Sequence, residues 1–329
     1  MIKIVQIGLG PLGQNIVQFI SERQGMKIVA AVDPAPGKSG MELGELCKIK
    51  PLGIEVSPDL KTAMRGKKAD VAVLTTLSNL KLVKEQIEEA ANAGLNIVST
   101  CEELSFPWEA NPQISKQIDK ICKDQNIACV GTGVNPGFLM DFLPSVLSSV
   151  CQKVTKVSVT RIQDASTRRV PFQKKIGAGL NDKQFREKEA EGTLRHVGLL
   201  ESIHMIAFCL NWKLEKTTES LNPVKATKTI KSGYVTINKE IACGVEQIGS
   251  GFINNKEVIR LHFRAAVGEE QSYDSIEIIG NPTIKSTIPG GVNGDIATCA
   301  ITINTIRSIL SVTPGLKTML DIPAPGYFN

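Results

Sequence analysis

The chain has 329 residues, of which 42% are hydrophobic, so it is long and apolar enough for two packed domains of ~150 residues each. This excludes a disordered or fibrous protein. Its 38 basic and 33 acidic residues give a formal net charge of +5, too small over this length to indicate a nucleic-acid-binding surface. We therefore expect no nucleic-acid partner, and the mild positive charge suits an anionic small ligand.

The chain contains eight cysteines and three histidines, without a C-x-x-C pair or a Cys/His cluster of metal-ligand spacing. The cysteines therefore predict free, buried thiols in a reducing compartment, and no bound metal. No apolar stretch of the sequence approaches the ~20 residues of a membrane-spanning helix. These features predict a cytoplasmic protein without a membrane partner.

The first part of the chain alternates short runs rich in Val and Ile with amphipathic stretches. Such alternation is typical of βαβ units around a parallel sheet whose strands are buried on both faces. We expect helices over residues 79–93 and 113–123. The expected strands are residues 2–7, 27–32, 71–75, 96–100 and 127–130.

From residue 153 the pattern changes to polar and apolar alternation, which indicates a mixed, largely antiparallel sheet. A helical insertion over 183–210 interrupts this pattern. An apolar helix over 296–310 is expected to return to the first domain. The expected strands of the second sheet are residues 153–161, 234–237, 239–247, 258–266 and 275–279.

These patterns predict an α/β chain with an N-terminal Rossmann dinucleotide-binding domain and a second α+β domain. We assign residues 1–134 and 293–329 to the first domain and 135–292 to a substrate-binding and dimerisation domain. Asn135 and Pro136 suit the start of a helix, expected to run to about residue 150. The broad second sheet needs cover, which favours a homodimer.

Three glycines after the first strand carry the clearest motif. Gly8, Gly10 and Gly13 have the spacing of a dinucleotide-binding turn. The first allows the turn, the second lets the backbone approach a pyrophosphate, and the third lets the helix pack on the strand. Pro11 and Leu12 open the helix, whose N-terminus stabilises negative charge. The motif predicts NAD or NADP as the cofactor.

Asp33 ends the second strand ~20 residues after the last glycine, where a carboxylate can accept hydrogen bonds from the adenosine ribose. Its charge would repel a 2′-phosphate and so favours NAD. Lys38 follows in a short loop, either as a solvated charge or as a phosphate contact. The sequence therefore leaves the choice between NAD and NADP open.

Hydroxyls and acids follow the next strands, at the edge where an open α/β sheet binds its ligands. Thr75, Thr76 and Thr100 are expected near the cofactor. Glu102 and Glu103 cannot both point the same way in extended chain, so we expect one to enter the site and the other to face solvent or a partner. The alternative is that both are ordinary loop charges.

Polar and charged groups gather over residues 161–169, at the end of an expected strand. Arg161 carries a planar guanidinium suited to a carboxylate, and Asp164 could hold an ammonium group. The alternative is a hydrophilic loop. His196 lies on the expected apolar stripe of the helical insertion, either as a core histidine or as a ligand contact.

Taken together, the chain resembles the 2,4-diaminopentanoate dehydrogenase and native amine dehydrogenase group of the dihydrodipicolinate reductase-like superfamily. The resemblance covers nearly the whole chain. The His-His segment expected of true dihydrodipicolinate reductases is absent from the sequence. The stretches that carry the resemblance are residues 5–13, 133–138, 161–169, 192–198 and 290–295.

The resemblance implies oxidative deamination, in which a hydride leaves the carbon bearing the distal amine of 2,4-diaminopentanoate, and water then releases ammonia to give 2-amino-4-oxopentanoate. It implies a catalytic role for Glu102, as a carboxylate that stabilises the iminium and moves protons. A same-fold imine or aldehyde reductase and a non-catalytic dinucleotide sensor remain alternatives. The substrate pocket implied by the resemblance contains Asn135, Phe138, Arg161, Asp164, Thr167 and His196.

Overall fold

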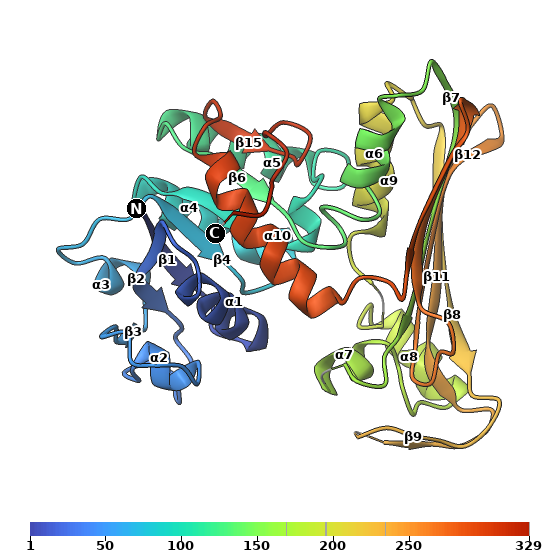
Figure 1. Ribbon diagram of the computed structural model, residues 1–329, viewed down its shortest axis with the longest axis horizontal. Helices are drawn as coiled ribbons and strands as arrows, with labels where there is room; N and C mark the ends of the chain where they lie inside the picture. The colour runs from blue at the N-terminus through green and yellow to red at the C-terminus, as the bar shows by residue number, and fades with distance from the viewer. Residues whose placement is uncertain (169, 195, 234, 329) are drawn as a thin grey trace. The chain divides into compact units, whose positions relative to one another are not determined.

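The computed structural model describes residues 1–168, 170–194, 196–233 and 235–328. The chain divides into two compact units, each with its own sheet (Figure 1). Unit 1 comprises Met1–Phe138 and Asn293–Asn329, and unit 2 comprises Leu139–Val292. The first boundary lies four residues after the one expected from the sequence.

Unit 1 is built on a seven-stranded parallel sheet with the order β15-β6-β5-β4-β1-β2-β3. Its five central strands lie within one residue of the expected ranges, which confirms the parallel α/β reading. The edge strands β3 and β15 are too short to show a periodic pattern. The strands are β1 (Ile2–Ile7), β2 (Met26–Val32), β3 (Val56–Ser57), β4 (Val71–Leu74), β5 (Asn96–Ser99), β6 (Ala128–Gly131) and β15 (Gly315–Lys317).

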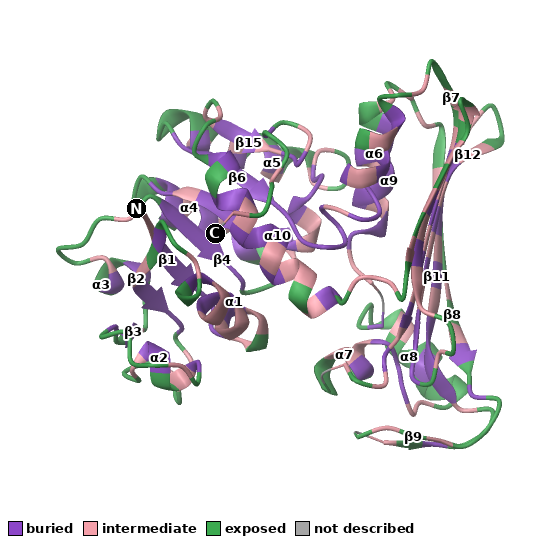
Figure 2. Ribbon diagram, in the orientation of Figure 1, coloured by how far each residue is buried: buried purple, intermediate pink, exposed green. Residues whose placement is uncertain are grey.

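Helices pack on this sheet and close its core. Apolar side chains of β1, β4 and β5 are buried together with Ile87 of α4 and Ile118 of α5, so the sheet is purple in Figure 2. The last helix, α10, packs against α1, as the sequence predicts. The helices of unit 1 are α1 (Pro11–Ser21), α2 (Leu43–Leu46), α3 (Leu60–Ala63), α4 (Leu80–Asn92), η1 (Glu102–Leu104), α5 (Pro112–Asp124) and α10 (Gly294–Ile309).

Unit 2 contains a six-stranded mixed sheet with the order β14-β13-β7-β12-β11-β8. Only the β7–β12 pair is parallel among these described strands, which confirms a largely antiparallel sheet. A small sheet pairs β9 (Ile230–Lys231) with β10 (Thr236–Ile237). The strands of the large sheet are β7 (Lys153–Asp164), β8 (Lys216–Lys225), β11 (Ala242–Ile253), β12 (Lys256–Ala266), β13 (Tyr273–Asn281) and β14 (Ile284–Pro289).

Several expected strand limits in unit 2 were wrong. β7 continues to Asp164, three residues beyond its expected end, because its polar last residues pair with β12. β11 begins at Ala242, since Glu240 lies in a turn with φ +67°. β8 was not expected because seven of its ten residues are polar, and β14 was not expected because it has only six residues, three of them polar. Residue 234, the expected start of another strand, lies outside the described residues.

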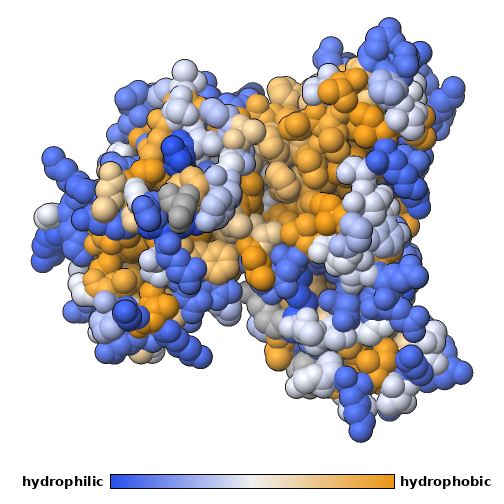
Figure 3. All heavy atoms as spheres, viewed as in Figure 1, coloured by the Kyte–Doolittle hydropathy of each residue, from blue (hydrophilic) through white to orange (hydrophobic). Residues whose placement is uncertain are grey.

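The helical insertion is two helices instead of one. α8 (Asp182–Ala190) and α9 (Leu199–Cys209) are separated by Gly192 and Gly198, whose φ values of +70° and +100° cannot continue a right-handed helix. α9 and α6 (Phe142–Ser148) pack together, and apolar side chains gather over them in Figure 3. The opposite face of the sheet carries no helix of the described chain (Figure 1).

The helix expected from Asn135 starts instead at Phe142, capped by Asp141. Gly137 has a φ of +118°, and a Cβ there would lie 2.5 Å from the Gly133 nitrogen. Residues 133–137 therefore fold into a tight loop that stays with unit 1. A further helix of unit 2, α7, spans Val170–Lys175. None of the helices in the described ranges is both long enough and apolar enough to cross a membrane.

Candidate active site

The glycine turn between β1 and α1 has the geometry of a phosphate cradle. Gly8 has a φ of +90°, and a Cβ there would lie 2.6 Å from the Thr75 carbonyl oxygen. A Cβ on Gly13 would lie 2.0 Å from the Gly8 oxygen, whereas one on Gly10 would meet nothing within 4 Å. Gly8 and Gly13 thus shape the turn, and Gly10 adjoins open space that a pyrophosphate fits.

The N-terminus of α1 adds charge to this cradle. Its N-cap is Gly10, and within the described chain no side chain caps it. Pro11 and Leu12 form the first turn, so backbone N–H groups and the helix dipole remain available to an anion. The residues present therefore fit a dinucleotide.

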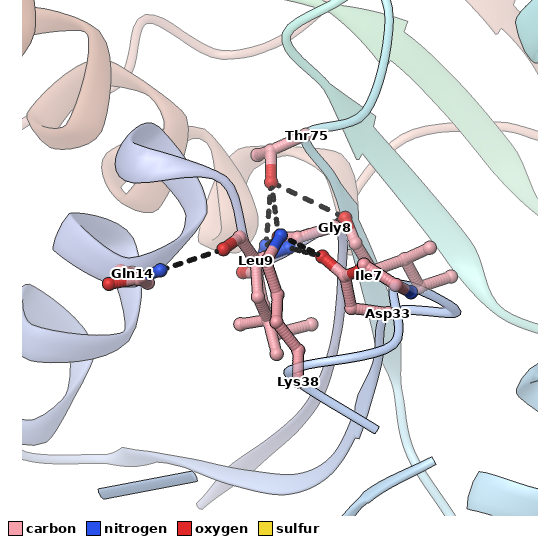
Figure 4. Close-up of polar contacts among 9 residues, drawn as sticks. Ile7, Gly8, Leu9, Gln14, Asp33, Lys38 and Thr75 are labelled. Carbon is pink, nitrogen blue, oxygen red and sulfur yellow. Dashed lines mark hydrogen bonds and ion pairs between the residues drawn. The ribbon is translucent and has the colours of Figure 1, made fainter. Parts of the chain in front are cut away.

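Two polar side chains brace the glycine turn from inside (Figure 4). The Thr75 hydroxyl donates to the Gly8 carbonyl at 2.8 Å and accepts from Gln6 Nε2 at 2.8 Å. Gln6 is fully buried in β1, a position where an apolar residue would be ordinary. The Thr75 hydroxyl is thus used within the protein, and Gln6 is a site residue that sequence reasoning missed.

The other two threonines expected at the cofactor lie at the same sheet edge. Thr76 is exposed, and its hydroxyl donates to Gln86 Oε1 at 2.6 Å. Thr100 follows β5 and is half-buried, with its backbone N–H bonded to the Leu74 carbonyl at 3.0 Å.

Asp33 lies beside the turn and is held by three donors (Figure 4). Its Oδ2 accepts from the Leu9 N–H at 2.8 Å and from Lys38 Nζ at 2.8 Å, and its Oδ1 accepts from the Ala35 N–H at 3.0 Å. Burial alone would raise the pKa of Asp33, but these hydrogen bonds and the Lys38 charge outweigh it and lower the pKa. Lys38 is therefore the ion-pair partner of Asp33 and not a solvated loop charge.

The adjacent acids after β5 have different surroundings. Glu103 Oε2 accepts from the Leu80 N–H at the start of α4, at 2.8 Å, and its Oε1 lies 3.4 Å from Asn79 Nδ2. Glu102 is half-buried on the same short helix, and its carbonyl accepts from the Ser105 N–H and hydroxyl. Glu103 is thus bonded to the start of α4 within the same chain, a contact that the sequence did not predict.

In unit 2, Arg161 is 2% exposed and paired inside the protein. Its Nη1 donates to Asp274 Oδ1 at 2.7 Å, and its Nη2 donates to the Val292 carbonyl at 2.9 Å. Gln163 Nε2 donates to the same carbonyl at 2.8 Å. Burial lowers the pKa of the Arg161 guanidinium, while Asp274 opposes that shift. Asp274 carried no sequence signal, since it lies 113 residues away.

Arg161 and Asp164 are not brought together. Side chains alternate along a strand, so residues three apart point to opposite faces, and β7 runs through both. Asp164 Oδ1 instead accepts from the Ser166 N–H at 3.0 Å and the Gly268 N–H at 3.1 Å. It caps a turn at the end of the sheet. Arg161 and Asp164, expected to meet a carboxylate and an ammonium group, therefore lie on opposite faces of the sheet, because β7 continues beyond Arg161.

His196 was expected on the apolar stripe of the helical insertion. It lies instead before α9 and is not part of that helix. Its ring stacks on Phe263 with a centroid distance of 4.5 Å. Its backbone N–H donates to Gln247 Oε1 at 2.8 Å, and its carbonyl accepts from Gln247 Nε2 at 3.0 Å. Phe263 is the register neighbour of both Arg161 and Gln247, so one row of the sheet joins these groups.

The remaining expected substrate residues lie at chain turns. Asn135 is 8% exposed within the tight loop after β6, and Phe138 is the last residue of the first segment of unit 1. Thr167 is exposed in the turn after β7. Residues 169 and 195, in two stretches that carry the resemblance, lie outside the described residues. Within the described ranges, no group of three or more His, Cys, Asp or Glu side chains could hold a metal ion.

Comparisons with known proteins identify the family to which each part of the chain is similar. Residues 2–130 match the family described as dihydrodipicolinate reductase, N-terminus, and residues 138–328 match the 2,4-diaminopentanoate dehydrogenase C-terminal domain. The 2,4-diaminopentanoate dehydrogenase of Acetoanaerobium sticklandii is 29% identical over 334 residues, which cover 98% of this chain and 94% of that protein.

Two further similar proteins match different shares of this chain. A 4-hydroxy-tetrahydrodipicolinate reductase of Methanocaldococcus jannaschii is 32% identical over 157 residues, or 45% of this chain and 54% of that protein. The structure of an amine dehydrogenase from Mycobacterium smegmatis superposes with a TM-score of 0.88 at 21% identity, covering 99% of this chain and 97% of that one. The family and cofactor class predicted from the sequence are confirmed. The chain therefore belongs to the 2,4-diaminopentanoate dehydrogenase family and is an NAD(P)-dependent dehydrogenase.

Proposed function

We propose that the protein catalyses the NAD(P)-dependent oxidative deamination of 2,4-diaminopentanoate to 2-amino-4-oxopentanoate and ammonia, and the reverse reductive amination. The observation that carries this proposal is the match of residues 138–328 to the 2,4-diaminopentanoate dehydrogenase C-terminal domain. It is supported by a relative of that activity along nearly the full length of both chains. The dinucleotide cradle and the acid after β5 supply the chemistry that the reaction needs.

The nicotinamide, when bound, supplies the hydride acceptor. The glycine turn and the N-terminus of α1 would hold the pyrophosphate, and Asp33 would accept hydrogen bonds from the adenosine ribose. A Glu102 carboxylate oxygen takes a proton from the substrate amine and stabilises the iminium charge that follows hydride loss. Glu102 passes the amine proton to solvent, so that its carboxylate is charged when the iminium forms. It then takes a proton from the water that attacks the iminium carbon and gives it to the nitrogen. The carbon–nitrogen bond breaks to release ammonia as the hydroxyl proton returns to the carboxylate.

For the cofactor we propose that both NAD and NADP are accepted. Asp33 alone would repel a 2′-phosphate, but Lys38 lies 2.8 Å from it and compensates its charge. The Lys38 side chain is 28% exposed, so it can turn toward a phosphate without leaving a buried site.

For the substrate we propose contacts from Asn135, Phe138, Thr167 and His196, with His196 offering a ring held in place by Phe263 and Gln247. We propose that the Arg161 guanidinium stays paired with Asp274 and does not bind a substrate carboxylate. Displacing Asp274 from the buried guanidinium would leave one of the two charges unpaired, at a cost of about 3–5 kcal/mol.

We further propose that the helix-free face of the unit 2 sheet forms a homodimer. This face has a hollow of about 440 Å³, and Ile279 of β13, a strand that lines the hollow, is 42% exposed. A Thr160→Arg substitution should give a monomer in light scattering, while Glu85→Arg on the exposed side of α4 should not change the mass. A monomeric wild-type protein would reject this assembly. The hollow is lined by Ser158, Thr160, Tyr273, Ser275, Glu277, Lys285 and Thr287.

The function is tested by supplying the protein with NADPH or NADH and 2-amino-4-oxopentanoate, with and without ammonium. We expect cofactor oxidation only when ammonium is present, with 2,4-diaminopentanoate as the product. Oxidation without ammonium would instead indicate a carbonyl or imine reductase. Tight cofactor binding with no turnover under either condition would indicate a dinucleotide sensor.

A further inference from the structure

The short helix η1 places two carboxylates next to one another, after β5 and near the start of α4. Both Glu102 and Glu103 are half-buried. The N-terminus of a helix attracts a carboxylate through its unpaired N–H groups and its dipole. Two adjacent acids can therefore compete for this one position.

The structure gives the position to Glu103. Its Oε2 accepts from the Leu80 N–H, the first N–H of α4, at 2.8 Å. Asn79 serves a different N–H of this helix, since its Oδ1 accepts from Leu82 at 3.3 Å. The two side chains thus cap different N–H groups, so Asn79 does not serve as the acceptor for the Leu80 N–H.

Backbone contacts tie the same two segments together. The Glu103 N–H donates to the Ser78 carbonyl at 3.3 Å, and Cys101 Sγ donates to that carbonyl at 3.2 Å. Glu102 is the residue between these two anchors. The turn that carries Glu102 is therefore held on both sides of it by the segment that starts α4.

The opposite side of the turn rests on β6. Leu104 is fully buried, and a Cβ on Gly131 would lie 2.6 Å from the Leu104 carbonyl carbon. The backbone of η1 is thus confined between β6 and the start of α4, and Glu103 is the charged side chain that closes the α4 side.

We propose that Glu103 is a positioning residue for the reaction: by occupying the N-terminus of α4, it fixes the turn and prevents that helix end from capturing the neighbouring Glu102. This inference rests on the proposed catalytic role of Glu102. Without the Glu103 carboxylate, the Leu80 N–H loses its acceptor, and Glu102 is the carboxylate next to Glu103 on the same turn. Its oxygen would then turn from the reacting carbon toward α4, and misplacement by ~1 Å can cost about 100-fold in rate.

The test compares Glu103→Gln, Glu103→Leu and a matched control, Glu42→Gln. Gln keeps an oxygen for the Leu80 N–H but loses the charge, whereas Leu loses both. Glu42 also holds backbone N–H groups: that of Glu45 in α2, and those of Leu52 and Gly53 in the loop that follows this helix. For each variant, kcat, KM for the amine, the primary deuterium isotope effect on kcat, cofactor Kd and Tm are measured.

We expect Glu103→Leu to lower kcat by about 100-fold and Glu103→Gln by about tenfold, with cofactor Kd and KM within about twofold of wild type. The isotope effect should rise because hydride transfer becomes slower. Glu42→Gln should lower Tm and leave kcat unchanged. If Glu103→Leu does not fold, Glu103→Gln decides alone.

A kcat within about twofold of wild type in the folded Glu103 variants, or a loss confined to Tm as in Glu42→Gln, would overturn the inference. Measuring Glu102→Gln beside these variants distinguishes a failure of the positioning role of Glu103 from a failure of the proposed function. If Glu102→Gln is inactive while the Glu103 variants turn over normally, only the positioning role is wrong. If Glu102→Gln turns over normally, the catalytic role of Glu102 and the inference both fail.

Discussion

The Arg161 guanidinium and the Asp274 carboxylate form a buried ion pair, with Nη1 2.7 Å from Oδ1 and side-chain exposures of 2% and 4%. Both partners also hold the backbone of Val292. Asp274 Oδ2 accepts from the Val292 N–H at 2.7 Å, and Arg161 Nη2 donates to its carbonyl at 2.9 Å. Val292 is the last residue of unit 2, so the pair fixes the point at which the chain leaves that unit.

Breaking this pair should destabilise unit 2. We expect Asp274→Asn to lower the free energy of unfolding by about 3–5 kcal/mol, because it leaves a buried guanidinium without its counter-charge. Urea denaturation measures this loss. The control is Arg260→Met, which removes an ion pair with Glu257 in which Arg260 is 43% exposed and should cost at most about 1 kcal/mol. Equal losses in both variants would show that the buried pair has no special weight.

The sequence predicts features that arise from local patterns. Runs of Val and Ile marked β1 and β5, and glycine spacing marked the turn before α1. The identity of side-chain partners depends on distant segments instead. Arg161 alone resembles a carboxylate receptor, and only the pairing of β13 beside β7 brings Asp274 to it.

The same limit applies to single strand ends. The polar residues after Arg161 look like a loop, but pairing with β12 extends β7 to Asp164. The Arg161 and Asp164 side chains therefore lie on opposite faces of the sheet. The separate surroundings of Glu102 and Glu103 also depend on where α4 starts, which no local pattern relates to the end of β5.

The cofactor preference should respond to Asp33 and Lys38 in opposite directions. Asp33→Ser should weaken NAD and improve NADP relative to NAD, because it removes a ribose acceptor and a repulsive charge together. Lys38→Met should lower NADP affinity more than NAD affinity, by about tenfold if Lys38 reaches the 2′-phosphate. Titration calorimetry with NAD+ and NADP+ gives both ratios. An unchanged ratio in both variants would show that neither residue reaches the ribose.

Stability at acidic pH should depend on the ion pair between Asp33 and Lys38. Although burial raises it, the pKa of Asp33 is lowered on balance from its ordinary value of 3.8 by Lys38 and by the Ala35 and Leu9 N–H groups. A lowered carboxyl pKa contributes stability that is present above the unfolded value and is lost as pH falls through the folded value. In wild type this loss should therefore begin below pH 3.8.

Lys38→Met removes a lowering contribution and brings the folded pKa of Asp33 closer to its unfolded value, so the Asp33 part of the loss should become smaller. The measurement is the free energy of unfolding as a function of pH for wild type, Lys38→Met and Lys38→Met/Asp33→Asn. We expect the single variant to be less stable than wild type near neutral pH and to lose less stability on acidification, and the double variant to show no Asp33-dependent step. Superimposable acid curves for wild type and Lys38→Met would contradict the coupling.

The most direct test of the central claim is the turnover of Glu102→Gln with 2,4-diaminopentanoate and NAD+ or NADP+, measured beside cofactor Kd. The amide keeps the size of the side chain but cannot take a proton from the amine or stabilise the iminium with a full charge. We predict a kcat lower by at least about 100-fold with cofactor Kd within about twofold of wild type. Near-normal kcat would contradict the account, because the acid after β5 would then have no part in the deamination.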